Sequence, residues 1–124
     1  MMINLLRDHR IPLINIVRRE EQVQLLKEEY KCEHVLNSSN EDFPERLKEL
    51  TKELEASVVL ECVSGPIVGQ IVDALPKNGI IITYGQLSEE KMSGISPLMF
   101  MGKNLTIEGF LLPYWMKEQS YWTQ

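Results

Sequence analysis

Residues 57–84 read SVVLECVSGPIVGQIVDALPKNGIIITY, and this stretch decides the fold. Its two ends, Ser57–Cys62 and Gly79–Tyr84, are apolar and rich in β-branched residues, which is typical of strands covered on both faces. Between them Ser64-Gly65 marks a turn, and Pro66 opens a helix with apolar residues at helical spacing. Two such strands joined through a helix predict a parallel pair, because parallel neighbours need a crossover connection.

The same alternation of strands and helices continues on both sides of this unit. Upstream, we predict a strand, a helix, a strand and a helix at Pro12–Val17, Glu20–Lys31, Glu33–Leu36 and Asp42–Glu55. Downstream, we predict a loop, one helical turn, a last strand and a helix start at Gln86–Pro97, Leu98–Gly102, Leu105–Leu112 and Pro113. Asp42 and Glu45 have the spacing of a capping box. The order of elements predicts an α/β domain with a mostly parallel sheet and helices on both faces.

Composition limits the classes of function. The 124 residues are enough for one domain, and 44% of them are hydrophobic, as in an ordinary globular protein. The net charge is −5 and no stripe of lysine or arginine stands out, which argues against nucleic-acid binding. Apolar runs are far shorter than the roughly 20 residues of a membrane-spanning helix. The N-terminus does not resemble a secretory signal, so we expect an intracellular protein, cytoplasmic or mitochondrial.

The residue types that bind metals or form nucleophilic sites are scattered. Cys32 and Cys62 have neither a CxxC nor a Cys/His spacing, so we predict no disulfide framework and no zinc site. Both are expected to be thiols in the core. His9 and His34 are isolated, and no catalytic residue can be named from spacing.

The residues that follow the predicted strands are the candidates for a ligand site, because doubly wound sheets bind ligands at the carboxyl ends of their strands. Arg18 and Arg19 follow the first predicted strand, where a dinucleotide-binding fold distinguishes its cofactors; arginine there can hold the 2′-phosphate of NADP. The alternative is that two arginines only solvate a strand end. Ser64-Gly65 and Tyr84-Gly85 also follow strands, and glycine lets a backbone approach a ligand closely. The chain has neither a Walker phosphate loop nor a GxGxxG run.

Five segments in order resemble one family. They are INIVRRE at 14–20, CEHVLN at 32–37, VLECVSG at 59–65, GIIITYG at 79–85 and NLTIEGFLL at 104–112. Together they resemble the cofactor-binding domain of the medium-chain dehydrogenase/reductase superfamily. Within it the zinc-free branch, with mitochondrial 2-enoyl thioester reductases and quinone oxidoreductases, is the most similar. The resemblance covers nearly the whole chain and implies a Rossmann-like nucleotide-binding domain at residues 1–124 with NADP(H) as its cofactor.

The resemblance also implies roles for individual residues. Arg18, beside Arg19, falls where these reductases place the arginine that meets the 2′-phosphate. The remaining implied cofactor-binding residues lie beside the nicotinamide ribose or flank the nicotinamide pocket: Cys62, Val63, Ser64, Gly65, Tyr84, Gly85, Phe110, Leu111 and Leu112. In this family the last strand pairs across a two-fold axis, so Leu105–Leu112 is the expected edge of a homodimer.

The sequence also departs from the family. The first strand and the glycine-rich turn that binds the pyrophosphate are absent, and Met2–Asp8 resembles only the tail of the helix that should follow them. The catalytic domain and its tyrosine are absent too, so a missing domain or a partner chain is implied. Without the first strand, the edges of Pro12–Val17 and Ser57–Cys62 would be unpaired. Such edges predict aggregation, pairing with another chain or direct pairing with each other.

Two hypotheses of different classes follow. The first is the nucleotide-binding part of an NADPH-dependent zinc-free oxidoreductase of the enoyl thioester or quinone reductase type, a fragment inactive by itself. The second is a non-catalytic dimerisation or interaction module derived from such a reductase. The missing glycine-rich turn favours the second, whereas the retained Arg18 favours the first. A flavodoxin-like or receiver domain is a weaker third idea, because the chain lacks both a Ser/Thr-rich phosphate loop and an acidic cluster after its first strand.

Overall fold

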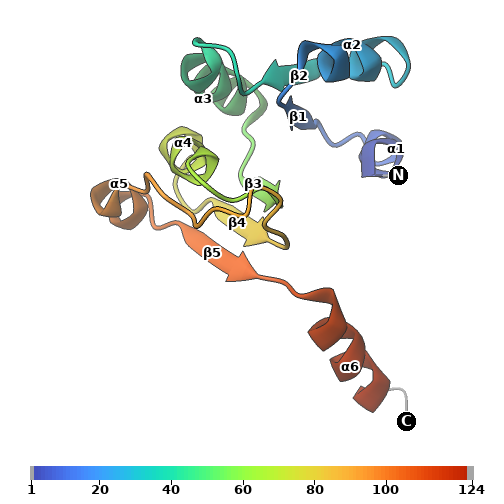
Figure 1. The fold of residues 1–124 in the computed structure, drawn as a ribbon, viewed down its shortest axis with the longest axis vertical. Helices are drawn as coiled ribbons and strands as arrows, with labels where there is room; N and C mark the ends of the chain where they lie inside the picture. The colour runs from blue at the N-terminus through green and yellow to red at the C-terminus, as the bar shows by residue number, and fades with distance from the viewer. Residues whose placement is uncertain (1, 123–124) are drawn as a thin grey trace. The chain divides into compact units, whose positions relative to one another are not determined.

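The computed structural model describes residues 2–122, with side chains as far as residue 119. The chain divides after Ala56 into two compact units, and each is described by itself. Both are built from parallel strands with helices between them (Figure 1). This pattern confirms the α/β class. No helix in the described part of the chain is long and apolar enough to cross a membrane.

The first unit contains a two-stranded parallel sheet and three helices. In chain order these elements are α1 (Met2–Asp8), β1 (Ile14–Val17), α2 (Glu20–Glu28), β2 (His34–Asn37) and α3 (Phe43–Leu54). The register runs from Ile14 opposite His34 to Val17 opposite Asn37, so both strands end at the same edge. The buried apolar side chains come from α2, β2 and α3: Val23, Val35, Leu36, Phe43 and Leu47.

The helix ends of this unit differ from the predictions in two places. Helix α2 ends at Glu28 instead of Lys31, because Lys31 takes a left-handed φ of 56° that turns the chain toward β2. The capping box predicted from Asp42 and Glu45 is wrong. The Asp42 side chain makes no cap hydrogen bond, and its φ of −85° and ψ of 2° lie outside the extended conformation of most N-cap residues.

The second unit contains a three-stranded parallel sheet in the order β3-β4-β5. Its elements are β3 (Val58–Glu61), α4 (Ile67–Ala74), β4 (Ile80–Thr83), α5 (Pro97–Gly102), β5 (Thr106–Gly109) and α6 (Leu112–Trp122). Glu61 pairs with Thr83, and Thr83 pairs with Gly109, so the three strands end level with one another. The core lies between the sheet and α4 and contains Val68, Ile71, Val72, Leu75, Ile81 and Leu105.

A glycine in α4 lets the loop after β4 pass close to the helix. A Cβ added to Gly69 would lie 2.4 Å from the carbonyl oxygen of Gly94, which no real Cβ tolerates. Gly94 itself has a φ of 74°, in the region that favours glycine. The 85–96 loop is therefore packed against α4 through two glycines.

The last strand is shorter than predicted. It ends at Gly109, and Phe110–Leu112 leaves the sheet, because Leu112 already begins α6 and Pro113 occupies its first turn. The helix start predicted at Pro113 is confirmed to within one residue, since α6 begins at Leu112 and has 11 residues. Within residues 2–122, β1 pairs with β2 in the first unit, and β3, β4 and β5 pair in the second.

Candidate functional site

Arg18 and Arg19 follow β1. Hydrogen bonds from neighbouring side chains fix their backbone, whereas their own side chains are exposed to solvent. The Ser39 hydroxyl donates a hydrogen bond to the Arg18 carbonyl oxygen at 2.8 Å. The Gln22 side chain accepts hydrogen bonds from the Arg18 and Arg19 amides, each at 3.2 Å. Both arginine side chains are exposed. Among the described residues neither forms an ion pair, so two guanidinium groups are available to an anionic ligand.

The acid that follows Arg19 does not neutralise it. The Glu20 carboxylate accepts a hydrogen bond from the Asn37 side chain at 3.2 Å, at the end of the neighbouring strand β2. The side-chain oxygen of Asn37, Oδ1, accepts a hydrogen bond from the Ser39 amide at 2.9 Å. This pair of contacts fixes the 37–39 loop beside Arg18.

At the end of β3 lies a buried carboxylate. Glu61 is only 4% exposed. Its Oε1 accepts hydrogen bonds from the amide of Val63, at 2.7 Å, and from the amide of Ser64, and its Oε2 accepts one from the Thr83 hydroxyl at 3.2 Å. Three donors thus satisfy a carboxylate that would otherwise be costly to bury.

These hydrogen bonds hold the predicted site segment 62–65 in an unusual backbone conformation. Ser64 and Gly65 have φ values of 68° and 78°, both left-handed. The loop after β4 lies along the same segment, since the Leu87 amide donates to the Cys62 carbonyl and the Ser88 amide to the Val63 carbonyl, each at 3.0 Å. The segments 62–65 and 85–88 therefore form one joined wall at the carboxyl end of the sheet.

Tyr84 directly precedes the 85–88 segment of this wall and lies next to Cys62. A side-chain hydrogen bond with the Cys62 thiol, then burial, and then the charges of Cys62 and Glu61 raise the pKa of Tyr84 above its usual 10.0. Gly85 is required for the close approach, because a Cβ there would lie 3.1 Å from the Cys62 carbonyl oxygen. Cys62 and Cys32 are free, but both are half-buried, so the prediction that they are core thiols is wrong.

A cavity of about 650 Å³ opens at the carboxyl ends of β4 and β5. Aromatic side chains from three segments line it, among them Tyr84, Phe110, Tyr114 and Trp115. The Phe110 and Trp115 rings lie 6.2 Å apart and are tilted by 48°, a favourable aromatic pair. A site of this size and lining suits a planar or apolar group.

The structure gathers most of the predicted residues of the second unit around this end of the sheet. Tyr84, Gly85, Phe110 and Leu111 line the cavity, whereas Leu112 does not. Cys62, Val63, Ser64 and Gly65 form the adjoining wall described above. Arg18 and Arg19 belong to the first unit.

Sequence reasoning missed four residues of this region: Glu61, Thr83, Tyr114 and Trp115. Glu61 carried a signal, since it is the single acid in the apolar run 58–63. Thr83 carried none, because threonine is common in strands. Tyr114 and Trp115 lie in α6, beyond the predicted strands, and their exposed fractions are 68% and 46%.

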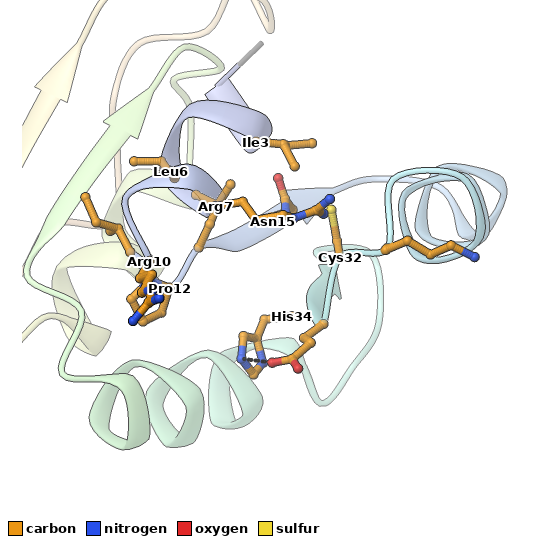
Figure 2. Close-up of a pocket in the computed structure, with 12 residues that line it drawn as sticks. Ile3, Leu6, Arg7, Arg10, Pro12, Asn15, Cys32 and His34 are labelled. Carbon is orange, nitrogen blue, oxygen red and sulfur yellow. Dashed lines mark ion pairs between the residues drawn. The ribbon is translucent and has the colours of Figure 1, made fainter.

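A further cavity, of about 330 Å³, lies in the first unit at the amino ends of β1 and β2 (Figure 2). Arg7, Arg10, Asn15 and His34 are among its lining residues, and His34 forms an ion pair with Glu33 at 3.4 Å. Arg7 donates a hydrogen bond to the Tyr30 carbonyl. This cavity lies at the ends of the strands opposite to Arg18, so it is not part of the predicted ligand edge.

Metal binding finds no support in the side chains. Among residues 2–122 no group of three or more histidine, cysteine, aspartate or glutamate side chains lies close enough to hold a metal ion.

A family model described as "Zinc-binding dehydrogenase" matches residues 1–124 of the chain. The mitochondrial enoyl-[acyl-carrier-protein] reductase of Homo sapiens is 30% identical over 112 residues, which are 86% of this chain and 29% of that protein. The chain therefore spans about three tenths of the length of the curated relatives it matches.

Two solved structures are similar to this chain in fold and in sequence. A candidate NADPH:quinone reductase from Mesorhizobium loti is 34% identical, with a TM-score of 0.84 over 94% of this chain and 34% of that one. The other is a variant of Etr1p, a mitochondrial 2-enoyl thioester reductase from Candida tropicalis, in complex with NADP and crotonyl-CoA. It is 25% identical, with a TM-score of 0.68 over 84% of this chain and 30% of that one. The similarity to these reductases confirms the resemblance found from the sequence motifs and the Rossmann-like fold class.

Proposed function

Because the chain belongs to the zinc-binding dehydrogenase family, with the enoyl and quinone reductases as its relatives, we propose that residues 1–124 are the nucleotide-binding part of an NADPH-dependent oxidoreductase. The parent enzyme would reduce an enoyl thioester or a quinone. The chain would bind and orient the nucleotide, and substrate and catalytic acid would be held by a further domain or a partner chain.

The observation that carries this proposal is the pair of uncommitted guanidinium groups after β1. Arg18 and Arg19 have no ion pair among the described residues, and the Ser39 hydroxyl lies at the Arg18 backbone. A 2′-phosphate is a dianion with three acceptor oxygens, and guanidinium groups bind such groups through paired N–H donors. The same position in an NAD-specific site holds an acid that accepts from the ribose hydroxyl, and neither Arg18 nor Arg19 can accept.

The aromatic cavity at the ends of β4 and β5 supports a site for the nicotinamide end of the cofactor. When bound, NADPH supplies the hydride for the reduction. The residues of this chain would orient the ring, with Tyr84, Phe110 and Leu111 as its flanks and the 62–65 segment beside the ribose. Apolar walls would also exclude water from the ring.

The proposal includes no zinc ion, although the description of the family names zinc binding. The described residues do not offer three ligands close together, so they do not fit a zinc ion, and no step is derived through one.

We also propose the partner that the family resemblance implied: a second copy of the chain, paired along β5. Strand β5 pairs with β4 on one side only. The Thr106 amide donates to the carbonyl of Gly79, just before β4, at 3.1 Å, and the Phe110 amide to that of Thr83 at 2.9 Å. Alternation along the strand therefore directs the Ile107 amide to the outer edge. The proposal further includes a single nucleotide-binding domain formed by both units and, from the names of the relatives, a mitochondrial location.

Titration calorimetry of the purified chain with NADPH and with NADH tests the proposal. We expect NADPH to bind and NADH to bind at least about tenfold more weakly, because only NADPH carries the 2′-phosphate. Light scattering on the same sample measures the mass. A folded dimer that binds neither nucleotide would contradict the proposal and favour the non-catalytic interaction module.

A further inference from the structure

Glu61 stands out among the buried titratable groups of the described chain. It sits on β3 between Leu60 and Cys62, and only 4% of it is exposed. A strand that only packs against a core has no need of an acid at its end, and burying an unsatisfied carboxylate would be costly. The three hydrogen bonds of Glu61 all go to segments that reach the candidate site.

We propose that Glu61 is a positioning residue of the nucleotide site, whose buried carboxylate fixes the 62–65 segment and, through the Thr83 hydroxyl, joins it to the end of β4. The inference rests on the proposed function, because the nucleotide gives the positioned groups their role.

The first link is the backbone of the 62–65 segment. Ser64 is not a glycine, yet it takes a left-handed φ of 68°, a conformation that carries strain unless the surroundings fix it. Oε1 of Glu61 accepts from the Val63 and Ser64 amides and so holds both peptide units. Hydrogen bonds to a charged acceptor are the strong ones, and two on one oxygen define a single geometry.

The second link joins β3 to β4. Oε2 of Glu61 accepts from the Thr83 hydroxyl at 3.2 Å, and the Glu61 carbonyl accepts from the Tyr84 amide at 3.0 Å. Tyr84 directly follows Thr83 in the chain, and it lines the aromatic cavity. A change at Glu61 would therefore move both the segment beside the predicted ribose site and one wall of the cavity.

Together the variants Glu61→Ala and Glu61→Gln separate the side-chain contacts of Glu61, which glutamine can keep, from its negative charge, which both variants remove. Glutamine keeps an acceptor oxygen for the Val63 and Ser64 amides, and its amino group can donate to the Thr83 hydroxyl. Alanine keeps none of these contacts. We expect NADPH to bind about tenfold more weakly to Glu61→Ala, and within about threefold of the unchanged chain to Glu61→Gln. Glu108→Ala, which removes an exposed acid from β5, is the matched control and should leave binding unchanged.

A measurement that needs no nucleotide keeps this inference separate from the proposed function. Amide hydrogen exchange followed by NMR reports the Val63 and Ser64 amides directly. We expect both amides to be protected in the unchanged chain and in Glu61→Gln, and to exchange at least about tenfold faster in Glu61→Ala. If the unchanged chain binds no NADPH but these protections hold, the proposed function fails while the positioning of the segment stands.

Two results would overturn the inference. One is NADPH affinity and amide protection in Glu61→Ala equal to those of the unchanged chain. The other is a Glu61→Gln variant as impaired as Glu61→Ala, since the negative charge, and not the hydrogen bonds to the 62–65 segment, would then account for the residue. If Glu61→Ala does not fold, Thr83→Val replaces it: this variant removes only the donor to Oε2, and unchanged Ser64 exchange and NADPH binding would again overturn the inference.

Discussion

Replacing Arg18 by alanine is the sharpest test of the proposed cofactor specificity. The Arg18 side chain is exposed and forms no ion pair with a described residue, so its removal breaks no internal contact. The backbone at this position is held separately by Ser39 and Gln22, which Arg18→Ala leaves in place. Any loss of affinity can therefore be assigned to the contact with the ligand.

The expected magnitude follows from the exposure of the side chain. A hydrogen bond to a charged group contributes about 1.5–3 kcal/mol, and solvent and salt screen an exposed pair, so we use the lower end, about 1.5 kcal/mol. That energy corresponds to an affinity about tenfold lower for NADPH. NADH lacks the 2′-phosphate, so its affinity should not change.

The assay is titration calorimetry with both nucleotides, at low and at high salt. Lys48→Ala removes one exposed positive charge from α3 and is the control for a general effect of net charge. We expect Lys48→Ala to match the unchanged chain, and we expect the effect of Arg18→Ala on NADPH to shrink as salt rises. Equal losses for NADPH and NADH would refute the assignment of Arg18 to the 2′-phosphate.

Three further predictions concern the second unit. Gly69→Ala forces a Cβ to within 2.4 Å of the Gly94 carbonyl and should lower the free energy of unfolding by about 3 kcal/mol in a urea melt, whereas Gly102→Ala, with nothing within 4 Å, should change it by less than about 1 kcal/mol. Ile107→Pro removes an outward amide of β5 and should convert a dimer into monomer by light scattering; an unchanged dimer would place the interface elsewhere. Tyr84 holds its proton more tightly in the folded chain than in the unfolded chain, so unfolding releases protons and stability should fall as pH rises above about 10. Cys62→Ala removes the main cause of that raised pKa and should weaken the fall; pH melts that are identical with and without Cys62 would contradict this.

Much of the fold follows from local patterns in the sequence. Four of the five predicted strands contain the observed one, and the strand predicted at Glu33–Leu36 ends one residue before β2 does, because apolar, β-branched runs favour strands. The ends were less predictable. The apolar run 105–112 continues past Gly109, but the strand does not. Pro113 is tolerated in a helix only in the first turn, and the helix that contains it begins at Leu112. The capping box predicted at Asp42 does not form, because the dihedral angles of Asp42 depend on how α3 meets the preceding turn.

The candidate site could be predicted from the sequence in part. The positions of Arg18, Ser64 and Tyr84 follow from the rule that ligands bind after parallel strands, whereas Phe110 came only from the family resemblance. The contacts of Glu61 with Thr83 do not, since they join residues 22 positions apart. The aromatic lining from Tyr114 and Trp115 depends on where α6 lies, which no local pattern specifies.

By itself the sequence determined the α/β class, the parallel direction of the strands and the family, because these depend on periodicity, crossover connections and short motifs along the chain. Only the tertiary structure decided which polar groups meet. It left the Arg18 side chain without an ion pair to any described residue and buried Glu61 against two amides and a hydroxyl. The physical reason is that hydrogen bonds act over about 3 Å, so the partner of a side chain is set by the packing of distant segments and not by its neighbours in the chain.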